Sequence, residues 1–446
     1  MEFFNPVSGD TVAFCEESQL EGKSGKAVKQ FLAAVVGLPR FRQKLLVEDG
    51  SREIPDDEMF SLTPLKIQKV QLLLLEFQEP RASLVKAMLH ASRQNNTSML
   101  DDLLRRPLDP DCKDARGMTS LHYAAASGHV GPMQLLLEAG ADKNHADDSG
   151  ASPLFMAAQQ SHVEAVHLLL EAGADKNQRV ESGESPLYAA SRQGNVQVVK
   201  ELLEAGADTS LVRTDVGVSP LLIAAEMGHV EVVKMLLAAG ADKSQNRTDA
   251  DASPLFIACQ QGHVEVVRLL IDAGANANHA TRGMGGTPLM IACQQGHLEV
   301  CRMLLKAGAH INQGRADIGA SPLWVACGEG HIEIAELLIS FRADTNDATT
   351  NFGASPLWVA AEQGQIETVR VLIQSRADID QGRTDTNATP VWAAASHGHL
   401  EIVRLLVEAG ADHYRKASDV DMSPLMIAFV RGHWPVVRLL DPEGNW

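Results

Sequence analysis

Histidine recurs at one position of a periodic pattern, directly after the residue that ends a short predicted helix. Histidine can bind a metal ion or transfer a proton near neutral pH. The eight members of this set are His129, His162, His229, His263, His297, His331, His399 and His433. Zinc requires its ligands about 2 Å from one ion, whereas neighbouring members of the set are separated by a whole structural unit. We therefore predict a structural role for these histidines and no metal site.

A candidate phosphate-binding loop lies near the N-terminus, at Gly22-Lys23-Ser24. The phosphate-binding motif has a second glycine five places before the glycine of this triplet, because backbone amides must approach the phosphate closely. That place is occupied by Glu17. The triplet is better interpreted as a turn that leads into a helix, and no nucleotide or other cofactor is predicted.

The chain contains 6 cysteines, and Cys259, Cys293 and Cys327 occupy one position in three successive units. Packed helices lie about 8–10 Å apart, and a disulfide needs Cα atoms within about 7 Å of each other. Successive members of this set therefore cannot pair without distortion. We interpret them as small buried side chains of a reduced protein of the cytoplasm, with the nucleus as the second compartment.

No arrangement of residues indicates an enzyme. Catalysis would require a nucleophile beside a base, a paired acid and base, or a phosphate cradle. The Ser, Asp, Glu and His residues that recur are accounted for as helix caps, turn residues or solvated helix faces. We predict that the protein is not an enzyme and has no catalytic residues.

Charge and hydropathy restrict the partners. The formal net charge of −18 and the isoelectric point near 5.3 argue against nucleic acid and anionic membranes. No run of about 18 apolar residues is present, which argues against a membrane span. The N-terminal residues MEFFNPVSGD lack the charged and apolar regions of a signal peptide.

The element that positions these residues is a recurring stretch, seen at Ser253–Asn278 as SPLFIACQQGHVEVVRLLIDAGANAN. Its first residue recurs after two steps of 33 and then steps of 34, at Thr119, Ser152, Ser185, Ser219, Ser253, Thr287, Ser321, Ser355, Thr389 and Ser423. Ser253 suits a helix N-cap and Pro254 the first helical position. Gly262 is expected to end that helix in a left-handed conformation.

A second helix is expected from Val264 to Ala273, with Val266, Val267, Leu269 and Leu270 facing inward and Gly274 ending it. The polar residues that follow predict a hairpin finger. A glycine usually lies two places before the next cap, at Gly150, Gly183, Gly217, Gly285, Gly319 and Gly353.

The unit resembles the ankyrin repeat, with its pattern T/S-P-L-x-x-A-x-x-x-G-H, a hydrophobic second helix, and then A-G-A-D/N. Ten copies occupy residues 113–446, and a degenerate copy at 80–112 retains Leu89, Ala91, Leu103 and Leu104. A terminal repeat is expected to be atypical. The resemblance implies a mainly α fold for residues 80–446, a solenoid of about 11 helix-turn-helix repeats with β-hairpin fingers. It also implies that the recurring histidine acts between the two helices.

Residues 1–79 lack the repeat and form the second predicted domain. Strands are expected at Glu2–Val7, Thr11–Glu16, Lys44–Val47 and Val70–Phe77, with a helix at Lys26–Val36. This order resembles the small α+β ubiquitin-like β-grasp domain. The resemblance places that family's apolar docking patch on Leu46, Leu73 and Val7, and it implies proteasome or ubiquitin-pathway receptors as partners. The family's terminal Gly-Gly is absent, so conjugation to other proteins is not implied.

The remaining positions are on the surface of the first helix, and the family uses them with the fingertips as a concave protein-binding face. We name these positions the inner row: Gln159, Gln160, Arg192, Gln193, Glu226, Met227, Gln260, Gln261, Gln294, Gln295, Glu329, Glu362 and Gln363. Three tryptophans, Trp324, Trp358 and Trp392, occupy one neighbouring position in consecutive repeats. They serve either as a binding hot spot or as packing beneath the fingers.

These observations predict a monomeric, non-catalytic protein scaffold or adaptor. A client protein would bind the concave face, and a second partner would bind the ubiquitin-like domain. The alternative is a targeting or regulatory subunit of an enzyme complex such as a ubiquitin ligase or kinase. Nucleic-acid binding is a third interpretation, which the negative charge disfavours.

Overall fold

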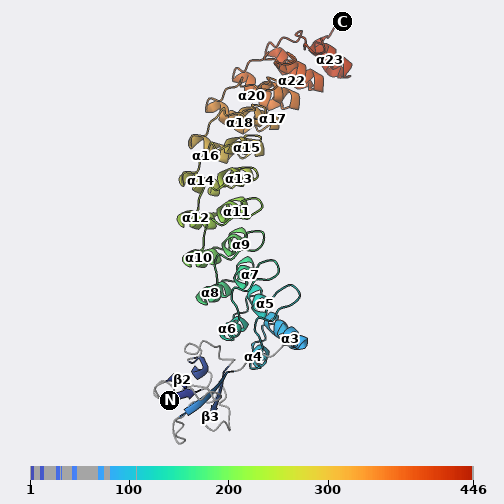
Figure 1. Ribbon diagram of the computed structural model, residues 1–446. Coiled ribbons are helices and arrows are strands. Elements are labelled where there is room, and N and C mark those ends of the chain that lie inside the picture. Colours follow the sequence, from blue (N-terminus) through green and yellow to red (C-terminus); the bar gives the residue numbers. More distant parts are fainter. Residues whose placement is uncertain are drawn as a thin grey trace. The chain divides into compact units, whose positions relative to one another are not determined.

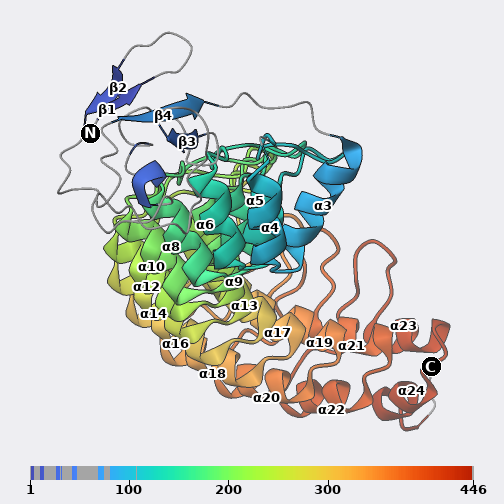
Figure 2. The ribbon, with the colours of Figure 1, turned by 90° about the horizontal axis from the view of Figure 1, so that it is seen from below.

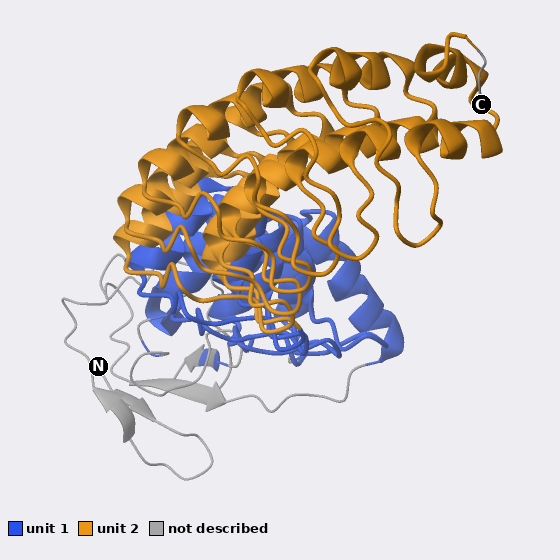
Figure 3. Cartoon of the chain, turned by 90° about the horizontal axis from the view of Figure 1, so that it is seen from above, with its two compact units in different colours: residues 1–215 blue, residues 216–446 orange. Residues whose placement is uncertain are grey.

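The computed structural model describes residues 2–4, 11–14, 27–30, 32, 43–47, 69–74, 81–106 and 108–443. The chain divides into two compact units, residues 1–215 and 216–446, which Figure 3 shows in blue and orange. The first unit holds the N-terminal strands and the first repeats, and the second holds the later repeats. The domain boundary at residues 79 and 80 stays a prediction.

Four short strands are described near the N-terminus: β1 (Glu2–Phe4), β2 (Thr11–Phe14), β3 (Gln43–Val47) and β4 (Lys69–Leu74). They pair in the order β2-β1-β4-β3. β1 is antiparallel to β2 and parallel to β4, and β3 is antiparallel to β4. Residues 27–30 and 32 are helical. These elements lie at or beside the segments expected from the sequence, whereas Gly22-Lys23-Ser24 lies outside the described residues.

The repeats are pairs of short helices (Figure 1). In the first unit the helices are α3 (Ala82–Arg93), α4 (Thr97–Leu104), α5 (Ser120–Ala126), α6 (Val130–Glu138), α7 (Pro153–Gln159), α8 (Val163–Glu171), α9 (Pro186–Gln193) and α10 (Val196–Glu204). In the second unit they are α11 (Pro220–Met227), α12 (Val230–Ala238), α13 (Pro254–Gln261), α14 (Val264–Asp272), α15 (Pro288–Gln295), α16 (Leu298–Lys306), α17 (Pro322–Glu329), α18 (Ile332–Ser340), α19 (Pro356–Gln363), α20 (Ile366–Gln374), α21 (Pro390–His397), α22 (Leu400–Glu408), α23 (Pro424–Val430) and α24 (Trp434–Leu440).

The boundaries of the helix pair follow the expected local chemistry. The Ser253 hydroxyl accepts a hydrogen bond from the Phe256 amide at 3.1 Å, and Pro254 is the first residue of α13. Gly262 ends the helix with a φ of 75°, a conformation that L side chains rarely adopt. The predicted N-cap, the proline at the first position and the terminal glycine are therefore confirmed in this repeat.

The degenerate first repeat is also a helix pair, α3 and α4, as the sequence indicates. Asn95 takes the place of the usual glycine and has a φ of 55°. Asn96 replaces the histidine, and its side chain accepts a hydrogen bond from the Met99 amide at 3.0 Å. Asparagine suits both tasks because it tolerates the left-handed conformation and caps helices well.

The core lies between stacked helices. Within each unit the first helices of successive repeats pack on one another and the second helices do likewise, which Figure 2 shows most clearly for α12, α14 and α16. One alanine per repeat is fully buried at this contact, with Ala258 as the member in α13. In α14, Val266, Val267 and Leu270 are buried, whereas Leu269 is only half-buried. The prediction that Leu269 faces the core is therefore wrong in part, because it lies at the edge of the buried stripe.

The fingers are tight turns closed by short-range backbone hydrogen bonds, such as those from the Arg247 amide to the Ala252 carbonyl at 3.0 Å and from the Asp251 amide to the Arg247 carbonyl at 2.9 Å. No strand is assigned within a finger in the described part of the repeats, where isolated bridges occur at Lys113–Thr119 and Ala417–Met422. The expected β-hairpins are thus too short to become strand pairs. None of the helices described is long and apolar enough to cross a membrane.

Candidate functional site

The inner row lies at the C-terminal end of each first helix. In the first unit Gln160, Arg192 and Gln193 are exposed and Gln159 is half-buried. In the second unit the half-buried members are Glu226, Gln260 and Glu362, and the exposed members are Met227, Gln261, Gln294, Gln295, Glu329 and Gln363. Because successive first helices pack on one another, these side chains form a solvent-accessible row within each unit.

In the second unit the recurring histidines hold the main chain of four inner-row residues, Glu226, Gln260, Gln294 and Glu362. A ring nitrogen of His263 lies 3.0 Å from the Glu226 carbonyl, and one of His297 lies 3.2 Å from the Gln260 carbonyl. A carbonyl only accepts, so each contacting nitrogen carries the proton. The contact joins each repeat to the preceding one, which accounts for these histidines structurally. The carbonyl partner was not foreseen from the sequence.

The three tryptophan side chains are less exposed to solvent than most of the inner row. Trp358 is buried, with 6% of its surface exposed, and Trp324 and Trp392 are half-buried. The guanidinium carbon of Arg383 lies 5.1 Å from the centre of the Trp358 ring. The Trp392 indole donates a hydrogen bond to the Met422 carbonyl at 3.0 Å. These contacts describe packing beneath the following finger, and a binding role for the three rings stays a prediction.

Gly328 lies in α17, and its surroundings indicate why this position is a glycine. A side-chain carbon at residue 328 would lie 3.2 Å from a methyl group of Val359 in the next first helix. That distance is tighter than an ordinary van der Waals contact. The glycine therefore lets two stacked helices approach each other.

The fingers carry a recurring ion pair that the sequence interpretation missed. Arginine and the aspartate two residues later are 2.6–2.7 Å apart in four fingers: Arg213 and Asp215, Arg247 and Asp249, Arg315 and Asp317, and Arg383 and Asp385. The hydrogen bond from the arginine lowers the pKa of Asp249, Asp317 and Asp385. The signal was present in the sequence, because each arginine lies six residues before a helix cap.

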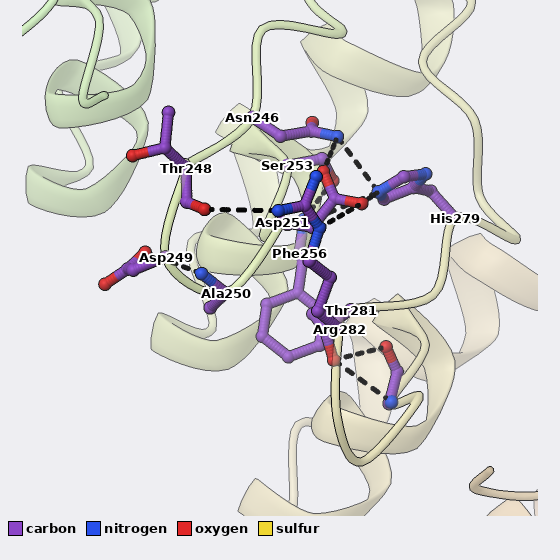
Figure 4. Close-up of polar contacts among 11 residues, drawn as sticks. Asn246, Thr248, Asp249, Ala250, Asp251, Ser253, Phe256, His279, Thr281 and Arg282 are labelled. Atoms are coloured by element: carbon purple, nitrogen blue, oxygen red, sulfur yellow. Dashed lines mark hydrogen bonds and ion pairs between the residues drawn. The ribbon is translucent and has the colours of Figure 1, made fainter. Parts of the chain in front are cut away.

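Three fingers have Asp251, Asn387 or Asp421 in place of the glycine two residues before the cap, and Figure 4 shows the finger of Asp251. Asp251 has a φ of 55°, and its side chain accepts a hydrogen bond from the Asn246 amide at 3.0 Å. His279 of the next finger lies 3.0 Å from the Asp251 carbonyl, and Arg282 lies 3.8 Å from the Asp251 carboxylate. The histidine and carboxylate thus hold adjacent fingers together, and their contacts explain them without a catalytic role.

The prediction that the recurring cysteines are buried is confirmed. Cys259, Cys293 and Cys327 are fully buried free thiols, and desolvation raises the pKa of each. Cys301 is an additional neighbour, with its sulfur 3.7 Å from that of Cys293. Within the part of the chain that is described, no group of three or more His, Cys, Asp or Glu side chains could hold a metal ion.

The predicted docking patch of the N-terminal domain is described only in its backbone. Leu46 pairs with Gln71 and Leu73 pairs with Lys44, so both leucines occupy positions of one sheet face. Leu45, at a position of the opposite face, is fully buried. Val7 and the side chains of Leu46 and Leu73 lie outside the described residues.

Comparison with known proteins gives a clear family match. The family described as Ankyrin repeats (3 copies) matches in overlapping segments at residues 88–180, 177–247, 244–315, 313–383 and 380–444. Among solved structures, the chain is similar to the human ASB11 ankyrin repeat domain, with 31% sequence identity and a TM-score of 0.43. That alignment covers 47% of this chain and 92% of the other. A search of curated proteins gave no match.

Proposed function

Because the chain belongs to the ankyrin-repeat family, we propose that it is a non-catalytic scaffold that binds a client protein through its inner row. The observation that carries this proposal is that one residue of a neighbouring pair in the inner row has its main chain fixed while the other presents an exposed side chain. The carbonyl of Gln260 is held by His297, while the side chain of the adjacent Gln261 is exposed. A rigid main chain that presents free side chains reduces the ordering that binding would otherwise require.

The chemistry of the inner row suits a polar client surface. Glutamine side chains both donate and accept hydrogen bonds, and the row contains Gln260, Gln261, Gln294 and Gln295 in consecutive repeats. The carboxylates of Glu329 and Glu362 add negative charge. A client face rich in backbone or amide groups, with basic residues at its edge, would complement this row.

A second partner would bind the N-terminal residues, for which we propose the ubiquitin-like β-grasp domain. Support comes from one mixed sheet with β1 parallel to β4 in its centre. Further support comes from a helical segment between β2 and β3 in which Val28 and Leu32 are fully buried. Proteasome or ubiquitin-pathway receptors are the partners that this resemblance favours.

Affinity capture with matched variants tests the client proposal. Four inner-row glutamines, at 260, 261, 294 and 295, would be changed to alanine together. The matched control changes Glu265 and Glu299, exposed residues on the second helices of the same repeats, to alanine. We expect the first variant to lose a client that the wild type and the control retain. Equal capture by all three forms would contradict the proposal.

The same experiment tests the docking patch and the alternative function. Leu46→Ala with Leu73→Ala should lose a ubiquitin-pathway receptor while retaining the client. If the captured proteins include a ligase or kinase catalytic subunit that depends on the inner row, the protein is a targeting subunit of that enzyme. Loss of both partners in either variant would indicate misfolding, which circular dichroism would detect.

A further inference from the structure

A pocket of about 400 Å³ lies beneath the finger that precedes α9, in the first unit. Its lining includes Phe155 and Met156 of α7, Ser149 of the preceding finger, and Val180 and Glu181 of the finger itself. Phe155 belongs to a buried cluster against which Met156 and Val180 pack. The pocket therefore has an apolar wall and a carboxylate.

Val180 makes the closing bond that arginine makes in other fingers, because this finger is one residue shorter; Arg179 lies six residues before the cap Ser185. Its amide donates to the carbonyl of Glu184, the residue just before the helix cap, at 3.0 Å. The equivalent closing bond runs from Arg315 to Ala320 at 2.9 Å and from Arg383 to Ala388 at 3.0 Å. Two different side chains, valine and arginine, thus start from the same place in the finger.

In a sister finger, meaning an equivalent finger of another repeat, an arginine fills this space; the example is Arg383, in the finger that precedes α21. The guanidinium carbon of Arg383 lies 4.7 Å from the centre of the Phe352 ring and 5.1 Å from that of Trp358. Phe352 and Trp358 lie three residues before and three residues after the cap Ser355. The same positions around the cap Ser152 are Ser149 and Phe155, and both line the pocket. The pocket is therefore the site that an arginine fills elsewhere, left open because valine is short.

The acid of the sister ion pair is also retained. Asp317 and Asp385 lie four residues before their caps, and Glu181 lies four residues before Ser185. Glu181 is exposed, and no ion pair to it is found among the described residues. Glu184, by contrast, lies 3.6 Å from Arg213. The finger thus keeps a carboxylate at the mouth of the pocket. Arg179, two residues before Glu181, is exposed, and no ion pair between these two side chains is found among the described residues.

We propose that this pocket binds an arginine side chain of the client protein. The methylene groups would lie along Val180 and Met156, and the guanidinium would pair with Glu181, as Arg383 pairs with Asp385. Arginine fits better than lysine because its planar guanidinium bonds a carboxylate through two nitrogens and stacks on aromatic rings. This inference rests on the proposed scaffold function and names one chemical feature of the client.

Synthetic random peptides, immobilised as an array and probed with the full chain, test the inference without a known client. We expect the bound peptides to be enriched in arginine at one position. Replacement of that arginine by lysine or glutamine should weaken binding by about tenfold or more. Glu181→Gln should remove the arginine preference, and Val180→Arg should do so by filling the pocket from within.

Asp249→Asn is the matched control, because Asp249 holds the same finger position as Glu181 but is already paired with Arg247 at 2.7 Å. It should leave the arginine preference unchanged. Peptides that bind without an arginine preference, or with one that survives both Glu181→Gln and Val180→Arg, would overturn the pocket inference and leave the scaffold function standing. Absence of any peptide binding would also overturn it, whereas capture of a client through the inner row would still support the scaffold.

Discussion

The glycine that lies two residues before most of the helix caps gives the sharpest test of how the fingers are held. Gly353 has a φ of 69°, and a side-chain carbon there would lie 2.6 Å from the Thr384 hydroxyl and 2.8 Å from the Thr384 amide nitrogen. That amide donates to the Phe352 carbonyl at 2.9 Å, which joins two successive fingers. Gly353→Ala should therefore strain the backbone and push the next finger away.

The expected cost can be separated into two parts. A left-handed conformation costs a residue with a side chain about 1–2 kcal/mol, and loss of the Thr384 hydrogen bond adds about 1 kcal/mol. We expect Gly353→Ala to destabilise the second unit by about 2–3 kcal/mol. Gly240→Ala is the matched control, because Gly240 has a φ of 86° and no atom within 4 Å of the added carbon. Gly240→Ala should therefore lose stability only through the cost of the left-handed backbone conformation, about 1–2 kcal/mol.

Native-state hydrogen exchange is the suitable assay, since long repeat arrays depart from two-state unfolding. The Thr384 amide should lose protection in Gly353→Ala and keep it in Gly240→Ala. The reasoning would be refuted if both variants lost equal stability and the Thr384 amide kept its protection. Asp251 at the same finger position shows that a side chain is accepted where the next finger supplies Arg282.

Three further predictions concern the stack. Ala258→Leu should overpack the contact between first helices and cost about 1–3 kcal/mol, with hydrogen exchange increased mainly in the adjacent repeats. His297→Ala should lose the bond to the Gln260 carbonyl and cost about 1 kcal/mol in denaturant unfolding, whereas His297→Gln should retain most of it. The hydrogen bond to the Glu201 carboxylate raises the pKa of His167. The contact therefore stabilises the folded protein below the ordinary histidine pKa of about 6.5, and this stability is lost as pH rises through the higher pKa of the folded state. An NMR titration of His167 measures the pKa.

Each of these predictions has its own control. Ala239→Leu changes an exposed alanine at the end of α12 and should be nearly neutral. His297→Gln has a precedent in the chain, where Gln365 donates to the Gly328 carbonyl at 3.3 Å. Glu201→Gln should return the His167 pKa toward its ordinary value, and an unchanged titration in that variant would contradict the assigned cause.

The helix pairs could be predicted closely because their signals are local. A serine cap, a proline at the first position and a terminal glycine each act within a few residues, so α13 and α14 were expected almost to the residue. The role of Gly328 could not be predicted in this way, because its reason is a methyl group of Val359 in the next repeat. The burial of Trp358 likewise depends on Arg383 of the following finger.

The exposure of the inner row could be predicted from the sequence, whereas its role as a binding site stays a prediction. The inner row follows from helical spacing, and its members are exposed or half-buried as expected for a surface. The pocket beside Val180 could not be found from spacing alone. It is found only when side-chain positions are compared in three dimensions, because Val180 leaves open a space that Arg383 fills in the finger before α21.

Site-specific photo-crosslinking tests the central claim most directly. A photoreactive amino acid would replace Gln261 or Gln295 in the inner row, or Glu265 or Glu299 on the second helices, in the full chain inside cells. All four positions are exposed, so reactivity with a bound protein depends on the face that it covers. The scaffold account predicts that one and the same protein crosslinks at residues 261 and 295 and does not crosslink at residues 265 and 299. Equal crosslinking from both faces, or crosslinking from the second helices alone, would contradict it.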